Sequence, residues 1–325
     1  MTDHEDGERT GGPATQKPER FLLVVVVNWK GGENTIQCIE SLLSQTTIGF
    51  ELLVVDNGSS DAELVTLKGK FRDAIEIARL SVNLGFPAAC NRAFVRAMEE
   101  KYRYVMLVNN DARLDPRAVN ALVKTAEVDE TIGAVVPKVY YWHRPSVIQC
   151  AGGRISLALG MTIHYGINST DTGEYDRVCD VEFAEASVCV YRVEALRQVG
   201  LFDENLFAYW EDADLSMRLH RGRFRIVYCP VAKVWHKVSQ SAPPHTKTFL
   251  FIRNALIFAN RYCSGVRILS ALLSILGIQT PILMLQSLDR AESAREKHQV
   301  LLAPLLAILW HVNPSRVSDS FWKPV

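Results

Sequence analysis

The sequence predicts an α/β fold with a mostly parallel central sheet, followed by a C-terminal helical region. Three observations lead to this prediction. Buried β-branched runs alternate with helical segments over residues 21–139, polar residues follow the strands, and the chain becomes helical and apolar beyond residue 247. With 325 residues, 48% of them hydrophobic and 22% charged, the composition excludes a disordered, collagen-like or disulfide-scaffold protein.

Five strands are expected in the first part of the chain. The apolar run FLLVVVVN is typical of a strand that is buried on both faces. Similar patterns predict the strands at 21–28, 51–56, about 75–81, 104–108 and 132–139. Helices are expected between them, at about 33–46, 61–72, 86–100 and from Pro116 onward. Later segments predict strands at 183–192 and 224–230, a short helix at 192–199 and an extended run at 231–236.

Polar residues lie just past the ends of four successive strands: Asn28, Asp56, Asn83 and Asp111. In an open α/β sheet this edge is where ligands bind, so the sequence predicts a site there. Asp56, in the turn DNGSSD, can bind a ribose or base edge. It can equally cap the helix that begins near residue 61, and the motif leaves both interpretations open.

A second candidate group lies after the fourth strand. Asn109, Asn110 and Asp111 look like a divalent-cation site, because a carboxylate at a strand end can hold Mg²⁺ or Mn²⁺. His236, which ends the run VWH, could complete the coordination. Asn and Asp are also common turn residues, and a lone histidine is more often a surface or core residue.

The densest acidic cluster comprises Glu211, Asp212 and Asp214, beside aromatic residues in LFDENLFAYWEDADLSMRL. One of these carboxylates is expected to have a raised pKa, which suits a general base. An acidic first turn that complements a helix dipole explains the pattern as well.

The loop NLGF at 83–86, with Asn91 in the following helix, could present backbone N–H groups to an anion or be a plain strand–helix connection. There is no G-x-G-x-x-G and no Walker A sequence, which argues against a dinucleotide-dependent dehydrogenase and a P-loop NTPase.

Charge is balanced overall but not along the chain. Lys+Arg and Asp+Glu both number 36, and this balance argues against a dedicated nucleic-acid binder. Residues 1–214 carry 21 basic and 32 acidic side chains, whereas residues 215–288 carry ten basic and no acidic ones. Such a basic segment could serve an anionic lipid surface, a phosphate-bearing ligand or nucleic acid.

The remaining features concern location. Seven scattered cysteines with no CxxC pair predict reduced thiols in a reducing compartment. No signal peptide is visible, and residues 1–20 are expected to be a disordered tail. Residues 268–288 carry no charge over 21 positions, close to a membrane-spanning length. Their polar residues and Pro281 favour a broken helix that lies in the membrane interface or packs against the domain.

Taken in order, six segments resemble the family 2 glycosyltransferases of the GT-A fold: VVVVNWKG, VVDNGSSD, NLGFPAACN, LVNNDARLDP, LFDENLFAYWEDADLSMRL and VWH. The nearest branch is the rhamnosyltransferase-like one that builds bacterial cell-surface polysaccharides. The resemblance covers about residues 21–263. It implies a Rossmann-like, nucleotide-sugar-binding GT-A domain at 21–246, followed at 247–325 by a membrane-proximal or oligomerisation region.

The resemblance also implies roles for residues. Asp212, paired with Glu211, matches the catalytic base, and Asp111 and His236 match the ligands of Mg²⁺ or Mn²⁺. Asp214 and Arg218 would orient the base or the diphosphate. The donor would be bound by Asn28, Asp56, Asn83, Gly85, Asn91 and Asn110. The chain departs from the family pattern at the first DxD position, which is Asn109, and after Asn91, where the family often has a glycine.

The function so implied is the inverting, metal-dependent transfer of a sugar from a nucleotide-sugar donor to a glycan or lipid-linked acceptor. The preferred donor is dTDP-rhamnose, with a UDP- or GDP-sugar as the alternative. A sugar nucleotidyltransferase should show a Gly-rich, basic N-terminal loop, of which KGG at 30–32 is only a faint echo. A membrane-docked scaffold or a nucleic-acid binder would leave the acidic cluster unexplained. We expect a cytoplasmic enzyme at the inner face of the cell membrane, with peripheral membrane contact, no nucleic-acid partner and the option of a homo-oligomer through the C-terminal helices.

Overall fold

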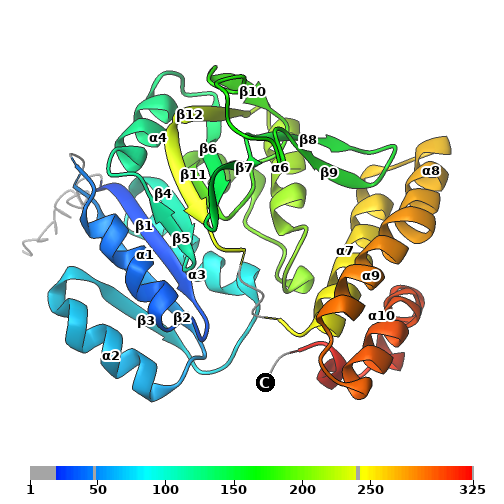
Figure 1. The fold of residues 1–325 in the computed structure, drawn as a ribbon. Helices are drawn as coiled ribbons and strands as arrows, with labels where there is room; N and C mark the ends of the chain where they lie inside the picture. The colour runs from blue at the N-terminus through cyan, green and yellow to red at the C-terminus, as the bar shows by residue number, and fades with distance from the viewer. Residues whose placement is uncertain (1–19, 47–48, 239–241, 324–325) are drawn as a thin grey trace, which may run out of the picture.

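The computed structural model describes residues 20–46, 49–238 and 242–323. The predicted α/β architecture is confirmed: a central sheet with helices on both faces, and further helices from the C-terminal part of the chain beside it (Figure 1). The disordered tail expected at 1–20 lies outside the described residues except for Arg20.

The main sheet has ten strands, in the order β10-β12-β6-β11-β4-β1-β2-β3, with β5 paired to β12 and β7 to β6. Its strands are β1 (Arg20–Asn28), β2 (Glu51–Asn57), β3 (Glu76–Leu80), β4 (Tyr102–Asn109), β5 (Ala112–Leu114), β6 (Ile132–Tyr141), β7 (Arg144–Cys150), β10 (Cys179–Val181), β11 (Val188–Arg192) and β12 (Arg225–His236). Strands β1, β2, β3, β4, β6 and β12 run in one direction, and β11 runs against its neighbours β4 and β6. A separate hairpin joins β8 (Gly153–Ser156) to β9 (Met161–His164).

The first strand shows why these apolar runs form a doubly covered sheet. Side chains alternate along a strand, so Leu23 and Val25 enter one core while Val24 and Val26 enter the other. All four are fully buried. Each such side chain contributes roughly 1.5–3 kcal/mol when it leaves water.

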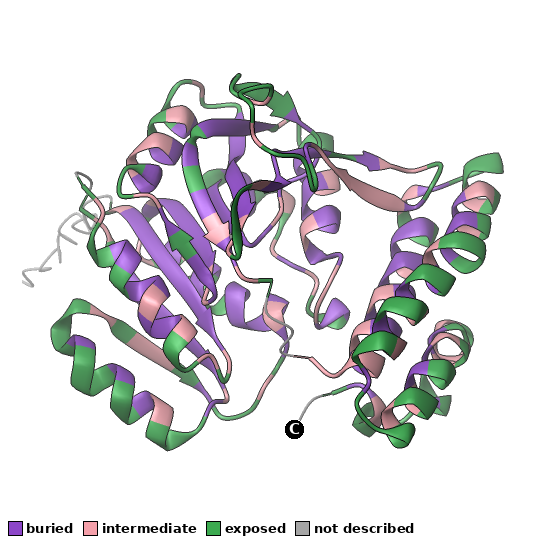
Figure 2. Cartoon of the chain, viewed as in Figure 1, coloured by how far each residue is buried: buried purple, intermediate pink, exposed green. Residues whose placement is uncertain are grey.

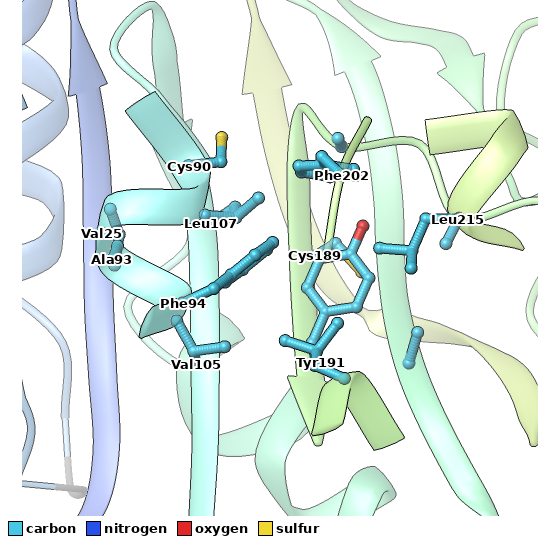
Figure 3. Close-up of a cluster of buried hydrophobic side chains, with 14 of the residues drawn as sticks. Val25, Cys90, Ala93, Phe94, Val105, Leu107, Cys189, Tyr191, Phe202 and Leu215 are labelled. Atoms are coloured by element: carbon cyan, nitrogen blue, oxygen red, sulfur yellow. The ribbon is translucent and has the colours of Figure 1, made fainter. Parts of the chain in front are cut away.

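Six helices supply these two cores. On one face lie α1 (Glu33–Leu43), α2 (Asp61–Phe71) and α4 (Ala118–Glu127), and on the other α3 (Phe86–Glu99), α5 (Val193–Val199) and α6 (Glu211–Arg221). Figure 3 shows Phe94 of α3 facing Tyr191 and Phe202, with ring centroids 5.7 and 5.3 Å away. This core holds α3 against the segment that leads to α6.

Two strand predictions needed adjustment. The strand expected at 183–192 begins only at Val188, because residues 185–187 line a cavity and leave the ladder. The strand expected at 224–230 and the run at 231–236 form the single strand β12. Its register shifts between Cys229 and Lys233, beside Pro230, which has no N–H group to donate to a ladder.

The C-terminal region consists of α7 (Pro244–Tyr262), α8 (Val266–Ser274), α9 (Thr280–Arg290) and α10 (Ala294–Val312). A π-helical turn, η3 (Ile275–Gln279), joins α8 to α9. The resulting helix, Val266–Arg290, is long and apolar enough to cross a membrane, and 28% of its most apolar window is buried. The π turn precedes Pro281, which cannot donate a helical hydrogen bond. Short 3₁₀ turns are η1 (Arg72–Ala74), η2 (Glu204–Leu206), η4 (Pro314–Arg316) and η5 (Asp319–Phe321).

Candidate functional site

One cavity of about 360 Å³ gathers most of the predicted site residues. It lies at the carboxyl ends of β1, β2 and β4, where α7 completes the wall with Thr246, Lys247 and Leu250. The predicted residues that line it are Asn83, Gly85, Asn110, Asp111, Glu211, Asp212 and His236.

Asn28 and Asp56 are fully buried and lie behind this wall. Asn28 donates from Nδ2 to Asp56 Oδ1 over 2.9 Å, and Asp56 Oδ2 accepts the N–H of Ser59 over 3.1 Å. The helix-cap interpretation of Asp56 is wrong, because Ser60 caps α2 by accepting the N–H of Glu63. The two residues therefore tie the ends of β1 and β2 together beneath the site.

Asn91 also faces inward. Its Nδ2 donates to the carbonyl oxygen of Phe202 over 3.0 Å, and its Oδ1 accepts the N–H of Phe202 over 3.1 Å. This two-way pairing binds α3 to the segment before α6. Asn91 shapes the site through that segment and is not part of the cavity wall.

Strand pairing brings Asp111 and His236 together. In the antiparallel pair of β5 and β12, His236 lies opposite Ala112, and Asp111 Oδ1 is 3.0 Å from His236 Nε2. Gln149 Oε1 lies 3.2 Å from His236 Nδ1 and fixes the ring orientation. Burial lowers the pKa of His236, but the hydrogen bond and the charge of Asp111 outweigh it and raise that pKa above its usual value.

This pair fits a small divalent cation. Two ligands at right angles, each about 2.1 Å from a cation, lie about 3 Å apart, so a cation shared by Asp111 Oδ1 and His236 Nε2 at their 3.0 Å spacing would replace the proton of their hydrogen bond. A carboxylate with an imidazole suits Mn²⁺ at least as well as Mg²⁺. Asn110 is engaged elsewhere, since its Nδ2 donates to Asn28 Oδ1 over 3.2 Å.

The acid pair Glu211 and Asp212 begins α6 at the cavity wall. Burial, reinforced by the charge of Glu185, raises the pKa of Asp212 to about 6, while the N–H groups of Ala213 and Ala186 oppose the rise. Burial and the charge of Asp212 raise the pKa of Glu211 well above its ordinary value. Glu211 is therefore the member that keeps a proton, and Asp212 is the member suited to act as a base near neutral pH.

Asp214 and Arg218, on the same helix, do not line the cavity. Asp214 accepts hydrogen bonds from Arg218 Nε over 2.9 Å, Arg261 Nη1 over 3.1 Å and the Tyr262 hydroxyl over 2.7 Å. These bonds attach α6 to the end of α7. Such a network orients the helix that carries Asp212 and leaves no direct contact with a ligand in the cavity.

Comparison with known proteins identifies the family. The model of glycosyl transferase family 2 matches residues 23–175, and that of glycosyl transferase family group 2 matches residues 104–317, more than half of the chain. The chain belongs to the family 2 glycosyltransferases.

Individual relatives agree with this assignment. N-acetylglucosaminyl-diphospho-decaprenol L-rhamnosyltransferase of Mycobacterium tuberculosis is 28% identical in an alignment of length 264 that covers 71% of this chain and 83% of the relative. The solved structure of GalNAc-T7 with UDP, GalNAc and Mn²⁺ has a TM-score of 0.58 at 14% identity, over 75% of this chain and 48% of that one. Mannosyltransferase PcManGT from Pyrobaculum calidifontis, with GDP-Man and Mn²⁺, has a TM-score of 0.53 at 14% identity, over 94% and 83%. The two structures share the fold of this chain.

The glycosyltransferase carries its acid pair at the end of a strained loop. Phe207, Tyr209 and Trp210 have φ values of 63°, 70° and 73°, in the left-handed region that bulky side chains rarely adopt. Gly85, itself at φ 91°, lies against this loop, and a Cβ there would come within 2.5 Å of the Phe207 oxygen. Only glycine fits that position, so Gly85 both lines the cavity and allows the loop to approach it.

Arg253 and Asn254 of α7 hold the loop from behind, and sequence reasoning missed both. Both side chains are fully buried. Asn254 Nδ2 donates to three loop carbonyl oxygens over 2.8–2.9 Å, those of Leu206, Ala208 and Tyr209. Arg253 Nη2 donates over 2.8–2.9 Å to the carbonyl oxygens of Asn205 and Leu206. The available signal was an Arg-Asn pair inside an otherwise apolar helical run, FLFIRNALIF.

The buried guanidinium of Arg253 is held by aromatic rings. Its central carbon lies 4.7 Å from the ring centroids of both Trp310 and Trp322. Burial lowers the pKa of Arg253 to about 10, which still leaves the group charged at neutral pH. The end of the chain thus completes the support of the loop.

Glu185 is a further residue that the sequence did not single out. It lines the cavity, its Oε1 accepts from Gln149 Nε2 over 3.4 Å, and its charge raises the pKa of Asp212. Gln149 in turn contacts His236, so Glu185 and Gln149 connect the pair Asp111–His236 to Asp212.

Asn254→Ala should lower kcat at least tenfold and change the donor KM much less. Three carbonyl groups would lose their partner and the loop before Asp212 would relax, with a loss of stability of about 2 kcal/mol. Steady-state kinetics and thermal unfolding measure the two effects. Asn205→Ala, at an exposed side chain of the same loop, is the control. Unchanged kcat in Asn254→Ala would contradict the role given to this residue.

The rate should fall as the pH drops through about 6, because Asp212 must be ionised to accept a proton. Glu185→Gln removes a negative charge that raises the pKa of Asp212, so the acid limb of the pH–kcat profile should move to lower pH. Glu194→Gln makes the same charge change on the exposed side of α5 and should leave the limb in place. An acid limb that stays in place or moves to higher pH in Glu185→Gln would refute the coupling between Glu185 and Asp212.

Proposed function

We propose that this glycosyltransferase transfers a sugar from a nucleotide-activated donor to an acceptor hydroxyl, with inversion and with a divalent cation, in cell-surface polysaccharide synthesis. The observation that carries the proposal is the cavity wall, on which a base-like Asp212 faces the same space as Asp111 and His236. The name of the mycobacterial relative supports rhamnose as the sugar, with dTDP-rhamnose as the donor, and a lipid-diphosphate-linked acceptor. A UDP- or GDP-sugar is the alternative donor, supported by the nucleotides in the two solved structures.

The chemistry is a single displacement. Asp212 accepts the proton of the acceptor hydroxyl, and the oxygen forms a bond to the anomeric carbon. The bond from that carbon to the diphosphate oxygen breaks on the opposite side, and the nucleoside diphosphate leaves with the electron pair. Glu211 keeps its proton and so does not compete as a base. A cation held by Asp111 and His236 would supply positive charge for the leaving diphosphate.

An apolar face on the C-terminal helices supports contact with a membrane. Exposed apolar side chains recur along the helix Val266–Arg290, at Val266, Leu269, Leu273, Ile278, Ile282 and Leu285. Figure 2 shows the exposed positions along the outer side of α8 and α9. Arg267 and Arg290 stand near the two ends, and α10 adds exposed Leu301, Leu305 and Val312. An uncharged face between cationic ends suits an anionic lipid surface. Because all seven cysteines are free, we propose the cytoplasmic side.

Donor specificity tests the function directly. Calorimetry with dTDP-rhamnose, UDP-GlcNAc and GDP-mannose, each with and without Mn²⁺, should give one preferred donor whose affinity rises with the cation. Asp212→Asn should retain donor binding and lose at least 10³-fold in kcat, because the base is removed while the wall is kept.

Asp180→Asn is the matched control, since the exposed Asp180 pairs with Arg225 and is not part of the cavity wall. Full activity in Asp212→Asn would refute the base. Donor binding that ignores EDTA would refute the cation.

Membrane contact is tested by flotation with vesicles. The chain should float with vesicles that contain phosphatidylglycerol, and Leu273→Asp with Leu285→Asp should reduce the bound fraction at least tenfold. Val128→Asp adds one exposed charge on α4's end and is the control. If the same double variant instead dissociates a dimer and leaves flotation unchanged, the face is an oligomer contact and the membrane proposal is wrong.

A further inference from the structure

The cavity has an unusual charge balance for an enzyme that must hold a diphosphate. Four carboxylate residues line it: Asp111, Glu185, Glu211 and Asp212. Among the described lining residues, Lys247 is the one lysine or arginine. A diphosphate that enters this space meets more negative than positive side chains. That single lysine is therefore the first side chain to consider as a partner for a diphosphate in this cavity.

Most basic residues of the segment 215–288 are engaged elsewhere. Arg218 and Arg261 bind Asp214, and Arg225 binds two other carboxylates. Lys237 Nζ donates to Asn34 Oδ1 over 2.6 Å and to a neighbouring glutamine. The sequence suggested a long basic surface, but among the described residues three of these ten basic side chains, Arg218, Arg225 and Arg261, form ion pairs with carboxylates of the same chain.

Lys247 differs from them in two respects. It lies in the first turn of α7 and faces the cavity between Thr246 and Leu250. Within the described part of the chain, no carboxylate forms an ion pair with it. Burial lowers the pKa of Lys247, and the positive charge of Arg290 lowers it further. A second cation is thus close to the first.

Arg290 reaches the same place from α9. Thr248 Oγ1 donates to Ser287 Oγ over 2.8 Å and so fixes the end of α9 beside the start of α7. Arg290 follows three residues later, and its charge also acts on Tyr209 of the cavity wall. It is exposed and, among the described residues, has no carboxylate partner. Two neighbouring cations repel each other, and an anion bound between them removes that repulsion.

We propose that Lys247 and Arg290 form a diphosphate-binding site at the α7–α9 side of the cavity. The inference deepens the proposed function and rests on it for the identity of the ligand. A diphosphate reaches this enzyme from two sources, the leaving nucleoside diphosphate of the donor and the lipid diphosphate of the acceptor. Either would bridge the two cations by charge-assisted hydrogen bonds. Arg290 ends the helix with the apolar face, so a lipid diphosphate could enter from the membrane side.

The test uses the full chain and calorimetry in excess EDTA, with three probes: inorganic pyrophosphate, dTDP or UDP, and farnesyl diphosphate. Lys247→Gln should weaken pyrophosphate at least tenfold and Arg290→Gln about threefold, whereas Lys247→Arg should stay within threefold of the parent chain. Arg267→Gln, the same charge change at the other end of the apolar helix, should have no effect. Thermal unfolding checks that each variant folds.

The probes separate the sources. When pyrophosphate binding is weakened as expected, a further loss for dTDP or UDP but not for farnesyl diphosphate assigns the site to the donor. A further loss for farnesyl diphosphate but not for dTDP or UDP assigns it to the acceptor; both results support the proposal. Equal affinity for all three probes in Lys247→Gln and the parent chain overturns it. If pyrophosphate binding depends on Lys247 but no nucleotide-sugar is turned over, the proposed function fails while the anion site stands.

Discussion

The hydrogen bonds from Asn254 to the loop before α6 are the interaction on which the site depends. Three carbonyl groups of that loop, those of Leu206, Ala208 and Tyr209, accept from one amide, and aromatic residues of the same loop adopt left-handed backbone angles. Each such angle costs of order 1–3 kcal/mol. Because the donor comes from α7, the loop that leads to Asp212 is held by a residue 45 to 48 positions later in the chain than the carbonyl groups it binds.

This dependence makes α7 the link between the sheet and the outer helices. On one side Arg261 and Tyr262 hold Asp214 of α6, and on the other Thr248 holds Ser287 of α9. A displacement of α9 would therefore be transmitted to the helix that carries the base. The apolar outer face and the acid pair Glu211–Asp212 are thus connected through α7, which gives the C-terminal helices a structural role at the site.

The strands and the site edge could be predicted because their signals are local. A β-branched run that is buried on both faces indicates a central strand in an α/β chain. The carboxyl ends of parallel strands meet at one edge of the sheet. The orientation of a polar side chain depends instead on residues that are distant in the sequence. Asn83 and Asn91 look alike in the sequence, but Asn91 turns inward because Phe202, 111 residues away, offers both a donor and an acceptor. Arg253 was missed because its burial requires Trp310 and Trp322 from the last part of the chain.

The charge pattern of the sequence was informative in a different way from the one expected. Part of the basic segment after residue 214 neutralises the acidic part before it, as the pairs of Arg225 with Asp129 and Asp180 show. These ion pairs do not include the carboxylates of the cavity wall, which outnumber its lysine and arginine side chains. Burial reduces this excess of negative charge, because it raises the pKa of Glu211 and keeps that side chain protonated. The remaining negative charge of the wall would repel an anionic donor unless positive charge on the wall offsets it. The wall offers two places for it, the side chain of Lys247 and the pair Asp111–His236 with the cation that we propose there.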